Sequence, residues 1–231
     1  MSPDDLINLF PTADWIALFL TLGLWLGIGW WIEHPGLKHP SVTVMMAERR
    51  RDWMRVMVTR EPRIFDSQIL ATLRQATSFF ASTSILAIGG VLALVGNTEP
   101  LQGVVAEITE VDAPVVIWQA KLGLVALFLT NSFLKFVWAN RLFGYCAVLM
   151  ASVPNDPSDE TAYPRAGQAA ELNIRAAINF NRGLRSMYYA LSTLAWLVGP
   201  VALIVATVVV TYILWSREFR SLPRSILQGK T

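Results

Sequence analysis

The sequence predicts an all-α integral membrane protein, a single polytopic domain with four membrane-spanning helices. Four apolar runs cross the 231-residue chain, at 12–32, 77–96, 115–139 and 187–215. At 1.5 Å per helical residue, each run can cross a hydrocarbon layer about 30 Å thick. No run has a carboxylate in its middle, and Asp14 stands at the very start of the first. With 54% apolar residues, the chain has room for one membrane domain and little else.

Basic residues are concentrated in two of the connections between the runs. Eight Lys and Arg lie between the first and second runs, and five Arg lie between the third and fourth. The connection at 97–114 and the tail before the first run have no Lys or Arg. The positive-inside rule therefore predicts that the N-terminus lies outside and that both long basic loops lie in the cytoplasm, as expected for an inner (plasma) membrane protein.

The C-terminal tail conflicts with this orientation. Four spans place it outside, yet it carries Arg217, Arg220, Arg224 and Lys230. The last run also contains Gly199-Pro200, where a helix loses a backbone hydrogen bond. We prefer one kinked span, because a broken backbone is costly in lipid. A re-entrant hairpin, which would leave the tail inside, is the alternative.

The cytoplasmic segments are expected to be helical extensions of the spans. Ser41 can cap an amphipathic basic helix, which we expect to lie along anionic headgroups of the inner leaflet. Asp66 can cap a helix over 67–95, and 165–185 is expected to be helical and to continue into the fourth run. The run Arg49-Arg50-Arg51 is flanked by acids, so we expect no nucleic-acid partner.

Small and polar residues inside the runs are the candidate functional residues. Gly23 and Gly27 form a Gly-x-x-x-Gly, a close-approach face within the bundle or between subunits. Ser78 and Ser82 share a helix face and favour helix packing over a solute path. Asn131 must find a partner, either on another helix or in a small anion or headgroup near Lys135.

A polar stripe leads down to the same region of the fourth run. Its members recur at three and four residues and are Arg175, Asn179, Arg182 and Ser186. Arg182 and Arg185 can bind lipid phosphate as bidentate forks or pair with Asp66, and the sequence leaves both options open.

Several further motifs resemble one known family. They are Met45 to Arg63, Asp66-Ser67-Gln68-Ile69-Leu70, Ser78-Phe79-Phe80-Ala81-Ser82-Thr83 with Ser84 to Gly90, Arg141-Leu142-Phe143-Gly144-Tyr145, Asn181-Arg182-Gly183-Leu184-Arg185 with Ser186 to Leu191, and Arg217-Glu218-Phe219. Together they resemble the bacterial and plant membrane proteins grouped as domain of unknown function 599. The resemblance covers most of the chain and implies a four-span membrane protein, with no reaction, substrate or catalytic residue.

The sequence favours a non-enzymatic membrane scaffold, accessory subunit or lipid-contacting component, with a homo-oligomer or another membrane protein as its partner. An oligomeric channel or carrier for a small, anionic solute is the alternative. A lipid-modifying enzyme using Asp66 or His34 comes third. With two His and one Cys, we expect neither metal nor cofactor.

Overall fold

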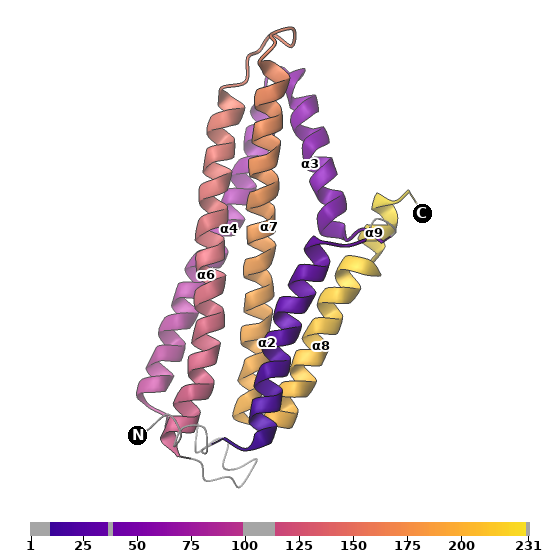
Figure 1. Ribbon diagram of the computed structural model, residues 1–231. Coiled ribbons are helices and arrows are strands. Elements are labelled where there is room, and N and C mark those ends of the chain that lie inside the picture. The colour runs from indigo at the N-terminus through magenta and orange to yellow at the C-terminus, as the bar shows by residue number, and fades with distance from the viewer. Residues whose placement is uncertain (1–9, 37–38, 99–113, 230–231) are drawn as a thin grey trace. The chain divides into compact units, whose positions relative to one another are not determined.

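The computed structural model describes residues 10–36, 39–98 and 114–229, and it is helical, with no strand in those ranges. Its elements in chain order are α2 (Thr12–Glu33), α3 (Val42–Val58), α4 (Ile64–Gly96), α6 (Val115–Ala151), α7 (Ala162–Leu194), a 3₁₀ turn (Ala195–Leu197), α8 (Pro200–Phe219) and α9 (Leu222–Leu227) (Figure 1). Four segments are long and apolar enough to cross a membrane, namely α2, α4, α6 and Pro200–Leu227. Most of the acidic second connection, with Lys38 and Lys230, lies outside the described residues.

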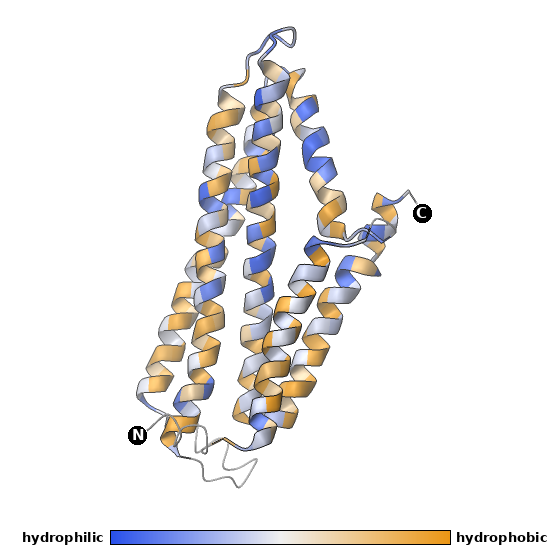
Figure 2. Ribbon diagram, viewed as in Figure 1, coloured by the Kyte–Doolittle hydropathy of each residue, from blue (hydrophilic) through white to orange (hydrophobic). Residues whose placement is uncertain are grey.

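The chain divides into two units, each of which is described by itself. Unit 1 comprises Met1–Trp31, Ser84–Ser132 and Leu184–Ser216, and unit 2 comprises Ile32–Thr83, Phe133–Gly183 and Arg217–Thr231. Hydrophilic residues recur along α3 and the first half of α7, whereas α2 and α8 are mostly apolar (Figure 2). Of the 19 Lys and Arg, only Lys121 and Arg185 fall in unit 1.

Hydroxyl and aromatic side chains join the helices of unit 1. The Oγ1 atoms of Thr21 on α2 and Thr207 on α8 lie 3.0 Å apart. The ring of Phe128 on α6 meets the rings of Trp25 and Tyr189 at centroid distances of 5.2 and 6.1 Å. Neutral hydrogen bonds and ring contacts of this kind associate helices in lipid, where burial of apolar surface gives little driving force.

The last apolar run is a helical hairpin, so the expectation of a single kinked span is wrong. The Tyr189 hydroxyl lies 2.7 Å from Oγ1 of Thr211, although 22 residues of one helix would separate them by about 33 Å. The reversal follows the 3₁₀ turn, at Gly199 with φ 153°, a conformation that favours glycine. Pro200 then begins α8, where its missing N–H costs nothing. Figure 1 shows α7 and α8 running in opposite directions.

The core of unit 2 depends on small residues of α7 and on the apolar side of α3. Met54, Met57 and Val58 of α3 are buried with Leu70 and Phe143, and five alanines of α7 allow close packing. Those alanines are Ala162, Ala166, Ala169, Ala170 and Ala176. Much of the apolar side of α3 therefore contacts protein. The expected surface helix on a lipid leaflet is not confirmed.

Among the described residues, Gly183 allows close approach, whereas a Cβ on Gly29 would make an ordinary contact, and neither glycine belongs to the Gly-x-x-x-Gly pair. A Cβ on Gly183 would lie 2.7 Å from the Phe136 ring, and one on Gly29 would lie 3.6 Å from Nε of Arg185. Gly23 and Gly27 are exposed, with nothing within 4 Å of an added Cβ. Their expected close-approach role within the bundle finds no support in the described residues, and their role between subunits stays a prediction.

Candidate functional site

The start of α3 is held by polar groups from two other parts of unit 2. Ser41 caps the helix: its hydroxyl accepts from Val44 N at 3.3 Å and donates to the Ile32 carbonyl at 2.7 Å. Glu218, near the end of α8, accepts from the backbone N and from Oγ1 of Thr43, each at 2.9 Å. A carboxylate is favoured there, because the N-terminus of a helix carries free N–H groups and a partial positive charge. The first turn of α3 is thereby fixed.

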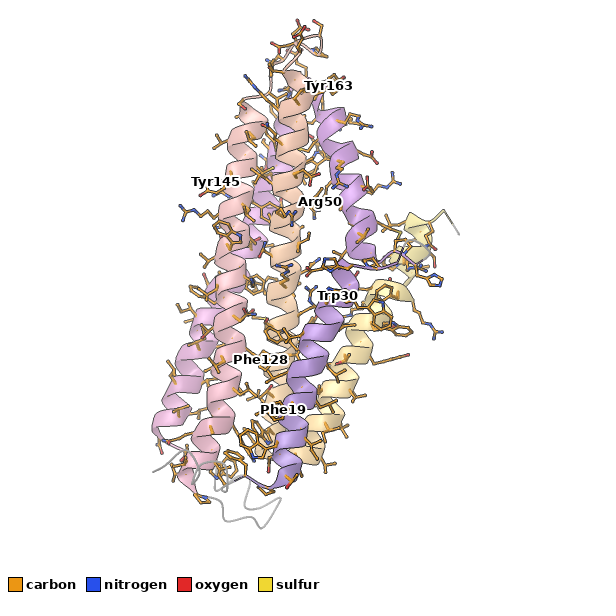
Figure 3. All side chains as sticks on the ribbon, viewed as in Figure 1. Phe19, Trp30, Arg50, Phe128, Tyr145 and Tyr163 are labelled. Carbon is orange, nitrogen blue, oxygen red and sulfur yellow. The ribbon has the colours of Figure 1, made fainter. Side chains whose placement is uncertain are left out.

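Arg50 lies two turns further along α3 and points toward α7 (Figure 3). One Nη1–H donates to Oδ1 of the fully buried Asn173. The amide of Asn173 in turn lies 3.7 Å from Sγ of Cys146, and that thiol donates to the Ala169 carbonyl at 3.3 Å. Desolvation by burial lowers the pKa of Arg50 below its ordinary value. A cation is thus held in a partly buried site by neutral groups.

A cavity of about 350 Å³ adjoins Arg50 within unit 2. It is bounded by α3, α4, α6, α7 and the end of α8, and most of its lining side chains are apolar. Its polar members are Thr43, Arg50, Thr77, Asn181 and Glu218. Small-molecule sites typically measure about 300–1,000 Å³ and combine apolar walls with a few polar groups, so this cavity has the size and lining of a ligand site.

Arg50 could not be singled out from the sequence as long as 49–51 was treated as one basic run. A signal was present: Met46 and Met54 stand four residues on either side of Arg50, on the same face of the helix. A basic residue within an apolar stripe differs from Arg49 and Arg51, whose side chains are 62% and 42% exposed. The partner Asn173, 123 residues away, has no local signal.

The carboxylates of Glu33 and Asp66 bind different partners, and Asp66 does not pair with Arg182. Arg182 donates from Nε to Oε1 of Glu33 at 2.9 Å and from Nη2 to Oε2, so its fork binds Glu33 rather than Asp66. Asp66 is fully buried and accepts from Trp53 Nε1 at 2.7 Å and from Arg60. A carboxylate in this position serves as a structural anchor, and no nucleophile or base contacts it among the described residues.

The other candidate residues are dispersed. Asn131 donates from Nδ2 to the Ser186 hydroxyl at 2.6 Å, which gives it a partner on another helix. Asn179 is buried and donates to the Arg175 carbonyl of its own helix at 2.9 Å. The remaining members differ in burial: Ser78, Ser82 and Arg175 are exposed, Lys135 is half-buried, and Arg185 is buried. Their roles in an anion path or in headgroup binding stay predictions.

Within the described residues, the fold defines the class: an all-helical protein with four segments apolar enough to span a membrane. A family model described as "Protein of unknown function, DUF599" matches residues 16–223. The chain belongs to this family, as the motifs in its sequence indicated. No curated protein and no solved structure matches the chain.

Proposed function

We propose that the chain is a non-enzymatic, lipid-contacting component of the bacterial inner membrane. One observation carries this proposal: large apolar side chains of unit 1 are exposed, while many of its polar side chains are buried. Among the exposed residues are Phe19 at 66%, Leu86 at 75%, Leu127 at 67% and Val201 at 71%. Thr21, Ser84, Ser186 and Thr207 are buried. Lipid rather than water is the solvent that favours this distribution.

The helical hairpin supports a revised topology for this proposal. The two helices of the hairpin, the end of α7 and α8, lie side by side and run in opposite directions. The chain therefore leaves the hairpin after Ser216 on the same side of the membrane from which α7 enters it. With the N-terminus outside and α2, α4 and α6 each crossing once, that side is the cytoplasmic one. Arg217, Arg220 and Arg224 then obey the positive-inside rule together with the two long basic loops.

The topology is tested by fusing reporters to Thr231. Green fluorescent protein is fluorescent when it folds in the cytoplasm, and alkaline phosphatase is active when it is exported. We expect a fluorescent fusion and an inactive phosphatase. The same reporters inserted at 155–160, within the second long basic loop, are the matched cytoplasmic control. An active phosphatase at Thr231 with a silent control would overturn the hairpin topology.

The lipid-contacting role is tested on the full-length protein after gentle detergent extraction. We expect bound lipid or a protein partner to copurify, and we expect reconstituted vesicles to show no flux of chloride or phosphate above that of empty vesicles. A lipid-free pure homomer argues against this role. Anion flux that falls in Asn131→Leu would replace it with the channel hypothesis.

A further inference from the structure

We propose that the cavity beside Arg50 binds an amphiphile with an anionic head and a single apolar chain, and that Arg50 contacts the anion. This inference rests on the proposed lipid-contacting role and names the ligand class and the site. Three observations carry it: the charge of Arg50, the lining of the cavity, and the position of Glu218.

The first observation is that Arg50 differs from its neighbours in its partners. Four other arginines of unit 2 contact carboxylates: Arg49 with Asp52, Arg51 with Glu48 and Glu171, Arg60 with Asp66, and Arg182 with Glu33. Arg63 also contacts neutral groups, but it donates to three carbonyls, whereas Arg50 has one neutral acceptor. Among the described residues, the hydrogen bond of Arg50 goes to a neutral amide, and no carboxylate pairs with it. A partly buried cation without a counter-charge is costly, and an anion in the adjoining cavity would offset that cost.

The second observation is that the cavity suits a hydrocarbon chain as well as an anion. Its walls carry Met46, Leu73, Phe143, Ile174 and Ile178. Thr77 adds little polarity, because its hydroxyl donates to the Leu73 carbonyl of its own helix at 2.7 Å. A small polar anion such as free phosphate would leave these walls unfilled, whereas a single chain attached to the anion would cover them.

The third observation indicates which end of the cavity binds the anionic head. Glu218 lines the cavity beside Thr43, seven residues from Arg50 and therefore about 10 Å away along the axis of α3. Its two carboxylate oxygens are bound by Thr43, and its charge repels a second anion at that end. The anionic head is therefore placed at Arg50 rather than beside Glu218, and the chain covers the apolar walls of the cavity.

Asn173 is a positioning residue in this arrangement. By accepting from one Nη of Arg50, it holds the guanidinium plane and leaves the remaining N–H groups for the ligand. An arginine fork is suited to a carboxylate or phosphate head, because it presents two parallel donors. Lysine would keep the charge at this position and lose that geometry.

The test uses the full-length protein in nanodiscs of neutral phosphatidylcholine, with dansylundecanoic acid as the probe and empty nanodiscs as the blank. We expect saturable binding of the acid and binding of its methyl ester weaker by about tenfold or more, because a charge-assisted hydrogen bond is lost. This comparison needs no variant. Equal binding of the acid and the ester, or no binding above the blank, would overturn the proposal.

Variants then locate the site. Arg50→Gln should weaken binding of the acid by about tenfold or more, and Arg50→Lys should weaken it by less. Arg49→Gln is the matched control, because it removes a neighbouring, exposed arginine of the same helix, and it should bind normally. Ala177→Phe, which narrows the cavity, should weaken acid and ester alike. Normal binding by a folded Arg50→Gln would overturn the assignment.

The source of the anion is settled by repeating the titration in nanodiscs of anionic phosphatidylglycerol. If the native protein binds the probe more weakly in these nanodiscs, and Arg50→Gln shows no such decrease, the ligand is the headgroup of a bilayer lipid. Unchanged binding would identify a free amphiphile, and both results agree with the proposed chemistry. If the probe fails to bind while lipid still copurifies with the protein, this inference fails and the proposed function stands.

Discussion

Unit 1 and unit 2 draw on several of the same helices, yet they are held together by different chemistry. Among the described residues, the side-chain links of unit 1 are made mainly by hydroxyls, amides and aromatic rings, as in Thr21 with Thr207 and Asn131 with Ser186. Unit 2 adds arginine and carboxylate pairs, among them Arg60 with Asp66. The difference is one of charge: neutral hydrogen bonds and ring contacts predominate in unit 1, although its buried Asp14 accepts from Trp196, whereas ion pairs contribute to unit 2.

The largest effect is expected at the buried carboxylate of unit 2. Asp66→Ala removes the acceptor of Trp53 and the counter-charge of Arg60, so we expect a loss of about 2–3 kcal/mol in the free energy of unfolding. The measurement is unfolding in mixed micelles by a denaturing detergent, followed by circular dichroism. Asp52→Ala removes an exposed pair on α3 and is the control, with a change below about 1 kcal/mol. Equal losses in the two variants would show that burial of the charge is unimportant.

The next effect tests close packing in unit 2. In Gly183→Ala the new methyl group meets the Phe136 ring at 2.7 Å, and Phe136 in turn stacks on Phe80 with centroids 5.5 Å apart. Because the ring has little room to move, we expect a loss of about 1–3 kcal/mol. Gly144→Ala on α6 is the matched control: nothing lies within 4 Å of its Cβ, and we expect a gain of up to about 1 kcal/mol. The same unfolding assay would reject this packing if both variants were stabilised.

How much of this could be predicted depends on whether the signal is local. The apolar helices α2, α4 and α6, each long enough to span a membrane, follow from run length and hydropathy alone, and the resemblance to the family was correct. The sequence could not decide between a kink and a chain reversal at Gly199-Pro200, because the same residues are compatible with both. The two differ in whether Tyr189 contacts Thr211, which lies 22 residues further along the chain. The Arg50 cavity was missed for a similar reason, since Asn173 is distant in sequence.

A smaller effect is expected for a hydroxyl pair in unit 1. The Thr21 hydroxyl donates to the Ala17 carbonyl at 2.8 Å, so the proton shared with Thr207 belongs to Thr207. Thr207→Val removes that donor and leaves Thr21 bonded, and we expect a loss of about 0.6 kcal/mol. Thr130→Val, at an exposed position of α6, is the control and should change stability less. A loss above about 2 kcal/mol would remove the contrast between the two units.

A similarly small effect is expected for an exposed ion pair of unit 2. Nε of Arg51 lies 2.7 Å from Oε1 of Glu171, and the side chains are 42% and 52% exposed. The Glu171 carboxylate raises the pKa of Arg51, but the guanidinium is already charged at neutral pH, so the pair adds no pH dependence there. A double-mutant cycle of Arg51→Gln and Glu171→Gln should give a coupling of about 0.2–1 kcal/mol that decreases in high salt. The contact of Arg51 with its second partner, Glu48, is kept in Glu171→Gln and is lost in both variants that carry Arg51→Gln. It therefore cancels, and the cycle measures the Arg51–Glu171 pair directly. A coupling as large as the loss in Asp66→Ala would mean that exposed charges stabilise unit 2 as strongly as the buried carboxylate does.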